Sequence, residues 1–593
     1  MTSRLSRRAL FVGSALLLAA CSSETSPEIS TGAGGSTHGA GGAGAGGGSA
    51  AGGNGSGAAC GDGTCGTVES CGACPADCGA CPPGADHPAL FFTDLTSGPS
   101  TGGQDDLGAF VTIYGDGFGP ERGSSTVTLG GVEVAKYVSW GENTGVARNL
   151  DTIVFQPGPG ATSGDLVVTV DGHASNPLPF EIRSGTIHFV IPADPNASDD
   201  NPGTFAAPYA TIYRSAGEVA AGDIVYVKGG TFDSADPRYP GWDCALCIFL
   251  DNDPSGTPAA PVAWIGYPGD PPELGAPAPL RRGLFIDAAV ESYVVANMRF
   301  TGYGGPLELW GNGHRIVGNH AHDGIYSNGG VVGIGGDSAH YRVYGNRLSN
   351  NGEAGDKLNG SGFYLQGFGT NQDIDLGWNQ VDGQKGARSI QVYGHLDGDR
   401  VEDVLIHDNL LTGAELNNIV LGGSDGATNI LGKVDVYNNV IVGSGDPGLR
   451  INDPEGTVNV FHNVLYDNGS PGLAGSTAQL YVERAGVGRV TVRNNVFFAV
   501  GAESYVTNDA VDGDAVIVAS NNLFFGADGC PAWDASCVSA DPSFEDAAAL
   551  DFRLGASSPA IDQGTDTGIA RDYLGVGRPQ GAAYDIGAFE HAP

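Results

Sequence analysis

The stretch Val434-Asp435-Val436-Tyr437-Asn438-Asn439-Val440-Ile441-Val442 decides the fold, because an Asn joins an alternating strand to a second apolar strand. The same arrangement recurs along the C-terminal two-thirds of the chain. The copies end in Asn297, Asn319, Asn346, Asn379, Asn409, Asn439, Asn463, Asn495 and Asn522. Successive copies lie 22, 27, 33, 30, 30, 24, 32 and 27 residues apart. This interval predicts a solenoid in which each copy forms one three-strand coil that stacks on the next.

The recurring Asn has a physical explanation. An Asn tolerates left-handed backbone at a bend, and its side-chain amide can bond the equivalent amide one coil away. Such a ladder resembles the one in pectate-lyase-like right-handed parallel β-helices. The alternative, surface turns in an all-β sandwich, does not explain nine copies at this spacing.

Both ends of the solenoid resemble the same superfamily. The segments Asp199–Thr204, Pro208–Ile212 and Ala221–Val227 resemble its first coil, and Ser558–Gly564 and Asp585–Glu590 resemble the closing coil of bacterial surface β-helices. The resemblance spans residues 187–593 and implies a fold more strongly than a reaction. We therefore expect an all-β chain with a right-handed parallel β-helix over 187–593.

An immunoglobulin-like β-sandwich is expected before the β-helix, over residues 88–184. Short alternating strands there are broken by Gly-rich turns. Ala109–Tyr114 leads into Gly115-Asp116-Gly117-Phe118-Gly119, and the strands Thr126–Val132 and Gly164–Val170 follow. This pattern resembles the TIG (IPT) domain, which implies a spacer or a carbohydrate contact.

The N-terminus has the pattern of an export signal over residues 1–21. Arg4, Arg7 and Arg8 precede an apolar run that ends in Leu18-Ala19-Ala20-Cys21. The ending resembles the bacterial lipobox, which implies that Cys21 is lipidated and that the protein is anchored, with Ser22 next, in the outer membrane. An ordinary cleaved signal is the alternative, and the paired arginines also resemble a twin-arginine signal. Residues 22–58, rich in Gly, Ala and Ser, are expected to be a flexible linker.

Ten of the eleven Cys residues remain after Cys21. Six of them crowd into residues 59–84, namely Cys60, Cys65, Cys71, Cys74, Cys78 and Cys81. An exported segment this small needs cross-links, so we expect disulfides, with a zinc knuckle as the alternative. The pairs Cys244/Cys247 and Cys530/Cys537 are expected to be local bridges.

The charge of the chain restricts its partners. With 28 Lys and Arg against 67 Asp and Glu, the formal net charge is -39. Nucleic acid is therefore excluded as a partner, since phosphate binding requires a basic surface. A polyanionic polysaccharide would also be repelled unless a divalent cation such as Ca²⁺ lies between. We expect a monomer that meets the membrane only through its lipid anchor.

A second set of strands precedes each Asn by about 10 to 18 residues. Their inward pairs are Leu307/Leu309, Val332/Ile334, Phe363/Leu365, Ile390/Val392, Ile419/Leu421, Leu449/Ile451 and Leu480/Val482. Because strand side chains alternate, the outward residues follow. One outward column is Glu308, Gly333, Tyr364, Gln391, Val420, Arg450 and Tyr481, and its neighbour is Trp310, Gly335, Gln366, Tyr393, Gly422, Asn452 and Glu483.

These columns contain aromatic side chains, amides and an Arg, which suit the C–H faces and hydroxyls of sugar rings. Their glycines would let a ligand approach the backbone. The predicted substrate-binding residues are Trp310, Tyr364, Gln366, Gln391, Tyr393, Asn452, Tyr481 and Glu483. An ordinary solvated sheet face is the alternative.

Cleavage is a further hypothesis. In the β-helix polysaccharide lyases a Lys or Arg removes the proton α to a uronate carboxylate, often with Ca²⁺ bound to that carboxylate. The resemblance implies Arg450 as the base, with His395 and Lys357 as alternatives, and Asp425 and Asp453 as metal ligands. A glycosidase would need two carboxylates that flank the bond, and no such pair is recognisable. A non-catalytic glycan-binding, adhesive or scaffold protein is the competing interpretation.

Overall fold

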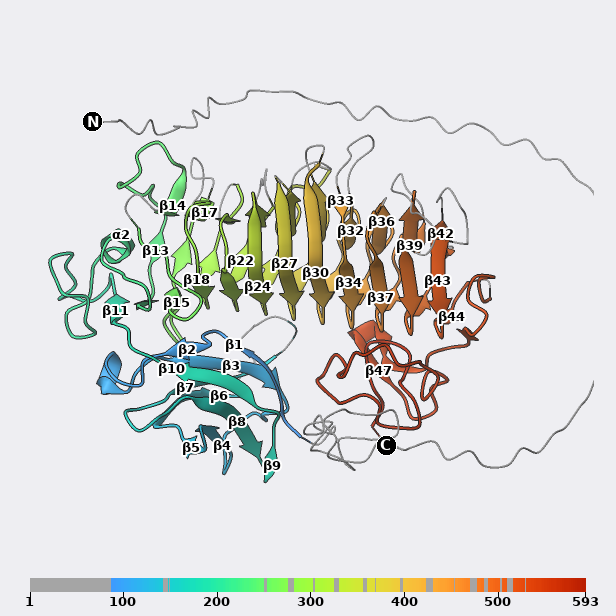
Figure 1. Ribbon diagram of the computed structural model, residues 1–593, viewed down its shortest axis with the longest axis horizontal. Helices are drawn as coiled ribbons and strands as arrows, with labels where there is room; N and C mark the ends of the chain where they lie inside the picture. The colour runs from blue at the N-terminus through green and yellow to red at the C-terminus, as the bar shows by residue number, and fades with distance from the viewer. Residues whose placement is uncertain are drawn as a thin grey trace, which may run out of the picture.

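The computed structural model describes residues 87–592 except 142–147, 149, 250–252, 276–281, 302–303, 325–329, 356–359, 368, 395–397, 423–429, 453, 470–476, 485–488, 502–503, 509–515 and 528. The expectations for Cys21, the linker and the six cysteines of residues 59–84 lie outside this part of the chain. Figure 1 shows a long stack of coils with two smaller bodies against one side.

The first body is a two-sheet β-sandwich. One sheet is antiparallel and has the order β1 (Ala89–Thr93), β3 (Val111–Asp116), β7 (Asp151–Gln156), β6 (Lys136–Trp140). The other has the order β2 (Ser97–Gly98), β10 (Leu178–Ile182), β8 (Gly164–Val170), β4 (Thr126–Leu129), β5 (Val132–Glu133), with β9 (His173–Ala174) beside β8. The short 3-10 turn η1 (Gln104–Asp106) follows β2. Val127, Phe155 and Phe180 fill the space between the sheets.

The C-terminal part is a right-handed parallel β-helix of three long sheets, as the Asn period predicts, and the predicted fold class is confirmed. Each coil runs through sheet A, then sheet B, then sheet C. Sheet A contains β14 (Cys244–Ile248), β17 (Arg282–Ile286), β20 (Leu307–Leu309), β23 (Val332–Gly335), β26 (Phe363–Gly367), β29 (Ile390–Gly394), β32 (Ile419–Leu421), β36 (Leu449–Asn452), β39 (Ala478–Glu483) and β42 (Ser504–Asn508).

Sheet B contains β11 (Ile187–Val190), β12 (Ile224–Val227), β15 (Val262–Gly266), β18 (Tyr293–Ala296), β21 (Arg315–Val317), β24 (Ser338–Tyr344), β27 (Thr370–Gly377), β30 (Arg400–His407), β33 (Ile430–Leu431), β34 (Val434–Tyr437), β37 (Val458–Phe461), β40 (Val490–Arg493) and β43 (Ile517–Ser520). Sheet C contains β13 (Thr231–Phe232), β16 (Glu273–Leu274), β19 (Arg299–Phe300), β22 (His320–His322), β25 (Arg347–Ser349), β28 (Gln380–Asp382), β31 (Leu410–Thr412), β35 (Val440–Val442), β38 (Val464–Tyr466), β41 (Val496–Phe498), β44 (Leu523–Phe525) and β45 (Val538–Ser539).

The interior of the β-helix is one continuous apolar core. All seven predicted inward pairs of sheet A lie in it, and none of their side chains is more than 2% exposed. The helix α2 (Ile212–Ala216) contributes Ile212 and Ala216 at the N-terminal end of this core. Period-two alternation therefore identifies the buried face correctly on every one of these strands.

Both local disulfides expected from the sequence are present, one near each end of the β-helix. Cys244 is bonded to Cys247, with Cα atoms 5.8 Å apart, and Cys530 is bonded to Cys537, with Cα atoms 6.0 Å apart. Cys537 also contributes to packing, which the local spacing did not predict. Cys530 is exposed, whereas Cys537 is half-buried and packs, like Trp533, against the apolar core. The Cys530–Cys537 bridge therefore ties an exposed turn to the C-terminal end of that core.

The predicted ladder of amides runs along the turn between sheets B and C. From Asn319 to Asn495, each side-chain Nδ2 donates to the Oδ1 of the next Asn at 2.9 to 3.0 Å. The ladder ends where Asn522 donates to Asp534 at 2.7 Å. Each ladder Asn is buried and has its remaining N–H group bonded to a backbone carbonyl.

Two details of the predicted ladder are wrong. The residue before each ladder Asn, and not the Asn itself, has left-handed backbone, as at Gly318 with φ 64° and Asn438 with φ 52°. Asn297 is that preceding residue in its own coil, with φ 56°, and Met298 occupies the ladder position. Asn297 therefore faces away from the ladder and bonds Asp94 of the sandwich.

Both smaller bodies cover outer faces of the coils (Figure 1). Phe110 and Tyr114 of the sandwich pack with Tyr226 and Tyr344, which point outward from sheet B. The C-terminal segment contains β46 (Phe544–Asp546), the 3-10 turn η4 (Ala547–Ala549) and β47 (Asp551–Leu554), and its Phe552 packs on sheet C with other apolar residues. Among the described residues, the sandwich packs on sheet B and the C-terminal segment on sheet C, and neither packs on the outer face of sheet A (Figure 1).

A buried charged cluster lies where the sandwich, sheet B and the C-terminal segment meet. His407 bonds Asp375 and Asp408, each at 2.7 Å. Although burial favours the neutral ring, the charges and hydrogen bonds of these carboxylates raise the pKa of His407 to about 10. Arg148 of the sandwich donates to the backbone of Asp408 at 3.1 Å and lies 3.4 Å from the ring centre of Tyr573. These contacts fix the three parts against one another.

Candidate functional site

The outer face of sheet A brings the predicted columns together in register. Tyr364 pairs with Gln391, Gln391 with Val420, Val420 with Arg450, and Arg450 with Tyr481. In the neighbouring column Asn452 pairs with Glu483. Since parallel strands lie ~4.8 Å apart, the column from Tyr364 to Tyr481 extends about 19 Å along the β-helix.

Arg450 is the centre of the polar part of this face. Its Nη2 donates to Glu483 at 2.6 Å, and its Nε donates to the side-chain oxygen of Asn452 at 3.2 Å. The guanidinium also lies 5.3 Å from the ring centre of Tyr481. The side chain is 33% exposed, so these contacts orient a cation that still reaches solvent.

A second arginine, Arg388, lies just before β29, two rungs from the strand that carries Arg450. Burial, and then the positive charge of Arg450, lower the pKa of Arg388, while Tyr364, Asp446 and Tyr393 act in the opposite sense. Its Nη1 lies 3.4 Å from the side-chain oxygen of Gln391, and its buried Nε has no hydrogen-bond partner among the described residues. Two guanidinium groups with one donor unsatisfied form a place where an anion is stabilised.

The alternating pattern of the strands does not predict Arg388, because the residue lies in the turn before β29. The side chain reaches the sheet face from that turn. The strand β32 between the two arginines presents Val420, which is small and 6% exposed, so the longer side chains on either side can converge over it. An Arg two residues before a strand of this face was the available signal.

Some outward positions are less accessible than predicted. Tyr364 is 8% exposed and Asn452 is 6% exposed, so both mainly support neighbouring side chains. The ring centres of Tyr364 and Tyr393 are 6.5 Å apart. Trp310, Gln391, Tyr393, Tyr481 and Glu483 are half-buried and form the accessible part of the face.

Gly335 and Gly336, on the rung after Trp310, leave room for the Trp310 ring rather than for a ligand. A Cβ atom added to Gly335 would lie 3.1 Å from the Trp310 ring, and one added to Gly336 would lie 2.7 Å from it. At Gly422 the same position is 2.1 Å from the backbone oxygen of Asn452. These glycines therefore accommodate neighbouring protein groups, which corrects the expectation from sequence.

Several predicted residues lie outside the described part of the chain, namely Lys357, His395, Asp425 and Asp453, together with the side chain of Gln366. Their roles stay predictions. Within the described ranges there is no group of three or more His, Cys, Asp and Glu side chains that could hold a metal ion. The same ranges contain no helix with the length and apolar character needed to cross a membrane.

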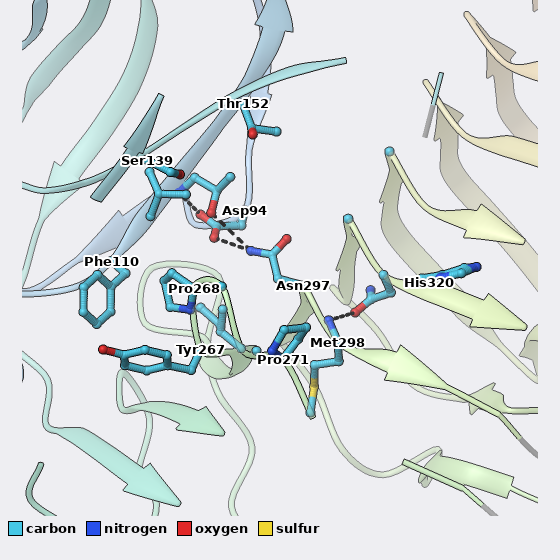
Figure 2. A pocket seen from close by; sticks show the side chains of 18 of the residues that line it. Asp94, Phe110, Ser139, Thr152, Tyr267, Pro268, Pro271, Asn297, Met298 and His320 are labelled. Carbon is cyan, nitrogen blue, oxygen red and sulfur yellow. Dashed lines mark hydrogen bonds between the residues drawn. The ribbon is translucent and has the colours of Figure 1, made fainter. Parts of the chain in front are cut away.

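A separate hollow of about 480 Å³ lies between the sandwich and the coils, next to Asn297 (Figure 2). Asp94 accepts hydrogen bonds from the backbone of Leu95 and Thr112 at 2.7 and 2.8 Å and from Asn297 at 2.9 Å. Burial raises the pKa of Asp94 to about 6, against these hydrogen bonds. Because its polar groups bond one another, the floor of this hollow joins the two domains rather than offering donors to a ligand.

No known protein family matches the sequence, and no characterised protein does. Solved structures with a similar course of the backbone include pectate lyase Pel9A, 16% identical, covering 69% of this chain and 96% of that chain with a TM-score of 0.40. A rhamnogalacturonan lyase is 15% identical over 61% of this chain and 90% of that chain, with a TM-score of 0.34. The catalytic unit of a GH87 alpha-1,3-glucanase from Streptomyces thermodiastaticus strain HF3-3 is 14% identical over 73% and 85%, with a TM-score of 0.31.

Proposed function

We propose that the protein binds an acidic polysaccharide along the outer face of sheet A. The observation that carries this proposal is the placement of Arg388, just before β29, and Arg450, on β36, two rungs apart on one face of a chain whose net charge is -39. A carboxylate that lies between two guanidinium groups is attracted by both and can accept hydrogen bonds from both. A uronate unit supplies that carboxylate together with hydroxyls and a C–H face.

The neighbouring residues complete the proposed site. Tyr393, on the strand that follows Arg388, and Tyr481, on the rung after Arg450, offer ring faces to adjoining sugar units. Gln391 and Glu483 accept hydrogen bonds from sugar hydroxyls, and they also orient Arg388 and Arg450 respectively. The site therefore combines charge recognition at its centre with stacking at its ends.

Titration with pectin, alginate and glycosaminoglycan oligomers tests this proposal. Arg388→Ala and Arg450→Ala should each weaken binding of the preferred acidic oligomer by about 1.5–3 kcal/mol, the range for a hydrogen bond to a charged group, and should reduce its dependence on salt. Tyr393→Ala and Tyr481→Ala should each cost about 1–3 kcal/mol, by analogy with stacking of bases on aromatic rings.

Arg400→Ala is the matched control. Arg400 is 40% exposed on sheet B and pairs with Glu402, so it resembles Arg450 in exposure and pairing. Its removal should leave binding unchanged. If Arg388→Ala and Arg450→Ala bind every oligomer as tightly as the parent does, sheet A is not the site.

Cleavage by β-elimination is the enzymatic form of this proposal. A base would take the proton on the carbon α to the carboxylate, and a double bond would form between the α and β carbons. The bond from the β carbon to the glycosidic oxygen would break, and that oxygen would leave with the electron pair and take up a proton. Of the predicted bases, Arg450 is the one that the structure describes, and its Nη2 already donates to the carboxylate of Glu483 at 2.6 Å. An arginine that is ion-paired with Glu483 is better suited to holding a uronate carboxylate than to removing a proton. We therefore propose binding without cleavage as the second candidate function.

Ultraviolet absorbance of the unsaturated product distinguishes the two candidates. Product that forms from one uronate polymer, and is lost when a chelator removes Ca²⁺, would support a lyase with Asp425 and Asp453 as its metal ligands. Binding without product on every polymer would support the non-catalytic candidate.

We also propose where this binding takes place. Lipidation of Cys21 would anchor the chain in the outer membrane, and the linker of residues 22–58 would hold the β-helix away from the lipid surface. The sandwich would then act as a TIG-like spacer, and a monomer would suffice because both arginines come from one chain.

A further inference from the structure

The N-terminal end of sheet A presents an exposed aromatic side chain. Trp242 is 42% exposed, and it is the only aromatic residue among the large apolar side chains that are exposed in the described part of the chain. The others are Val132, Val138, Val500, Val518 and Leu550. An exposed indole leaves a large apolar surface in water, and Trp is enriched among the residues that dominate binding energies.

The Trp242 ring is fixed by its neighbours. Its centre lies 4.7 Å from that of Phe249 and 5.0 Å from that of Phe285, and the rings of Tyr239 and Phe249 are 4.6 Å apart. We call these four residues the aromatic platform. A ring held in this way loses little conformational entropy when a ligand stacks on it.

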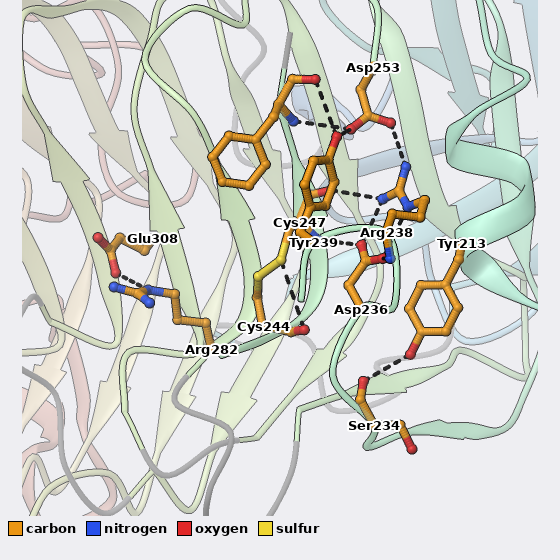
Figure 3. Close-up of a disulfide and its surroundings, with 11 residues drawn as sticks. Tyr213, Ser234, Asp236, Arg238, Tyr239, Cys244, Cys247, Asp253, Arg282 and Glu308 are labelled. Carbon is orange, nitrogen blue, oxygen red and sulfur yellow. Dashed lines mark hydrogen bonds and ion pairs between the residues drawn. A yellow bond between two sulfur atoms is a disulfide. The ribbon is translucent and has the colours of Figure 1, made fainter. Parts of the chain in front are cut away.

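A rigid polar scaffold holds the segment that carries Trp242 (Figure 3). Arg238 pairs with Asp236 at 2.7 Å and with Asp253 at 2.6 Å, and both carboxylate side chains are fully buried. The hydroxyl of Tyr239 donates to Asp253 at 2.7 Å. A buried network of this kind orders the turn from Asp236 to Trp242, in which the backbone N–H of Trp242 donates to the carbonyl of Tyr239 at 3.1 Å.

A disulfide strengthens the same scaffold. It joins Cys244 to Cys247 within β14, with Cα atoms 5.8 Å apart. The two cysteines form a buried apolar cluster with Phe285, against which Tyr239 and Phe249 also pack. The structure therefore fixes the base of the aromatic platform as well as its turn.

The aromatic platform continues the proposed glycan face. Phe285 of β17 pairs in register with Glu308, then Gly333, then Tyr364. Beside it, Arg282 pairs with Glu308, which also accepts a hydrogen bond from Trp310 at 3.3 Å. From β17 to β36 there are six rung steps, or about 29 Å at ~4.8 Å each.

We propose that the aromatic platform is a second sugar subsite, in which Trp242 stacks on the C–H face of a pyranose ring while Arg282 and Glu308 bond its hydroxyls. This inference rests on the proposed function of sheet A. Because the strand beside Arg388 is four rungs from β17, about 19 Å, and that of Arg450 is six rungs away, about 29 Å, a trisaccharide held at Arg388 and Arg450 cannot reach Trp242, whereas a decasaccharide can. The protein would therefore select long chains.

Calorimetric titration of the full chain with trimers and decamers of galacturonate and of alginate tests the proposal. The parent should bind the decamer more tightly than the trimer, beyond the statistical gain from additional registers. Trp242→Ala should lower affinity for the decamer about tenfold, which is within the range for stacking on an aromatic ring, and leave the trimer unchanged. Trp242→Phe should keep much of the gain.

Two further variants make the result specific. Val518→Ala removes an apolar side chain of similar exposure, 44%, from sheet B and should change neither affinity. The double variant Cys244→Ser/Cys247→Ser should weaken decamer binding alone, since it loosens the base of the platform.

The results for Trp242→Ala and for the parent distinguish failure of the second subsite from failure of the proposed function. Unchanged decamer binding in Trp242→Ala overturns the second subsite and leaves the proposed function intact. If no trimer or decamer binds the parent, the proposed function and the second subsite are both refuted.

Discussion

Replacing Asn409 by Ala tests how much the amide ladder contributes to the stability of the β-helix. The Asn409 side chain is fully buried and makes four hydrogen bonds. Its Oδ1 accepts from the backbone and the side chain of Asn379 at 2.9 and 3.0 Å. Its Nδ2 donates to Asn439 at 2.9 Å and to the carbonyl of Leu376 at 3.0 Å.

The magnitude follows from which groups keep a partner. In Asn409→Ala the side chain of Asn379 still donates to Val343, and that of Asn439 still accepts from the backbone of residue 409. The backbone N–H of Asn379 and the carbonyl of Leu376 lose their ladder partner. At about 1–3 kcal/mol for each of these two unsatisfied buried groups, the free energy of unfolding should fall by about 2–6 kcal/mol.

Denaturant titration followed by circular dichroism measures this loss, with Asn459→Ala as the matched control. Asn459 is half-buried on sheet B and makes one side-chain bond, to Asp435 at 2.7 Å. Its removal should cost about 1 kcal/mol or less. An Asn409→Ala loss no larger than that of Asn459→Ala would refute the ladder as a major source of stability.

Three further predictions concern other parts of the chain. Because the folded pKa of His407 is raised to about 10, its stabilising effect is complete below the unfolded pKa near 6.5 and is lost as the pH rises through 10. The unfolding midpoint should therefore fall between pH 7 and 10, and His407→Gln should remove much of that dependence; an identical slope in the variant would contradict this. Arg148→Ala should destabilise the chain by about 2–4 kcal/mol, because a buried guanidinium that bonds Asp408 and stacks on Tyr573 is lost, and a change below about 0.5 kcal/mol would argue against a docking role. Cys21→Ser should release the protein from the membrane fraction with its fold intact, and retention after detergent-free washing would disprove the lipid anchor.

Local patterns in the sequence were sufficient to predict the coils. The inward pairs of sheet A alternate strictly, and their burial follows from the geometry of a strand. Asn297 was misaligned by one residue because Ala296-Asn297 resembles the other turns locally. Only the register with Asn319, set by the following coil, distinguishes the ladder position from the left-handed one before it.

The functional face was harder to predict, because an outward direction is not the same as exposure. Tyr364 points away from the core and is nevertheless covered by its neighbours. Arg388 and Trp242 each lie in the turn before a strand of sheet A, where no alternation exists to predict a direction. Such residues depend on the path of the turn, which is determined by tertiary contacts such as the Arg238 network.

A crystal structure of the protein with a bound acidic decasaccharide tests the central claim most directly. We predict that the glycan lies along the outer face of sheet A, with a carboxylate between Arg388 and Arg450 and a ring against Tyr393 or Tyr481. Glycan bound instead in the hollow beside Asn297, or on sheet B or C, would contradict the account.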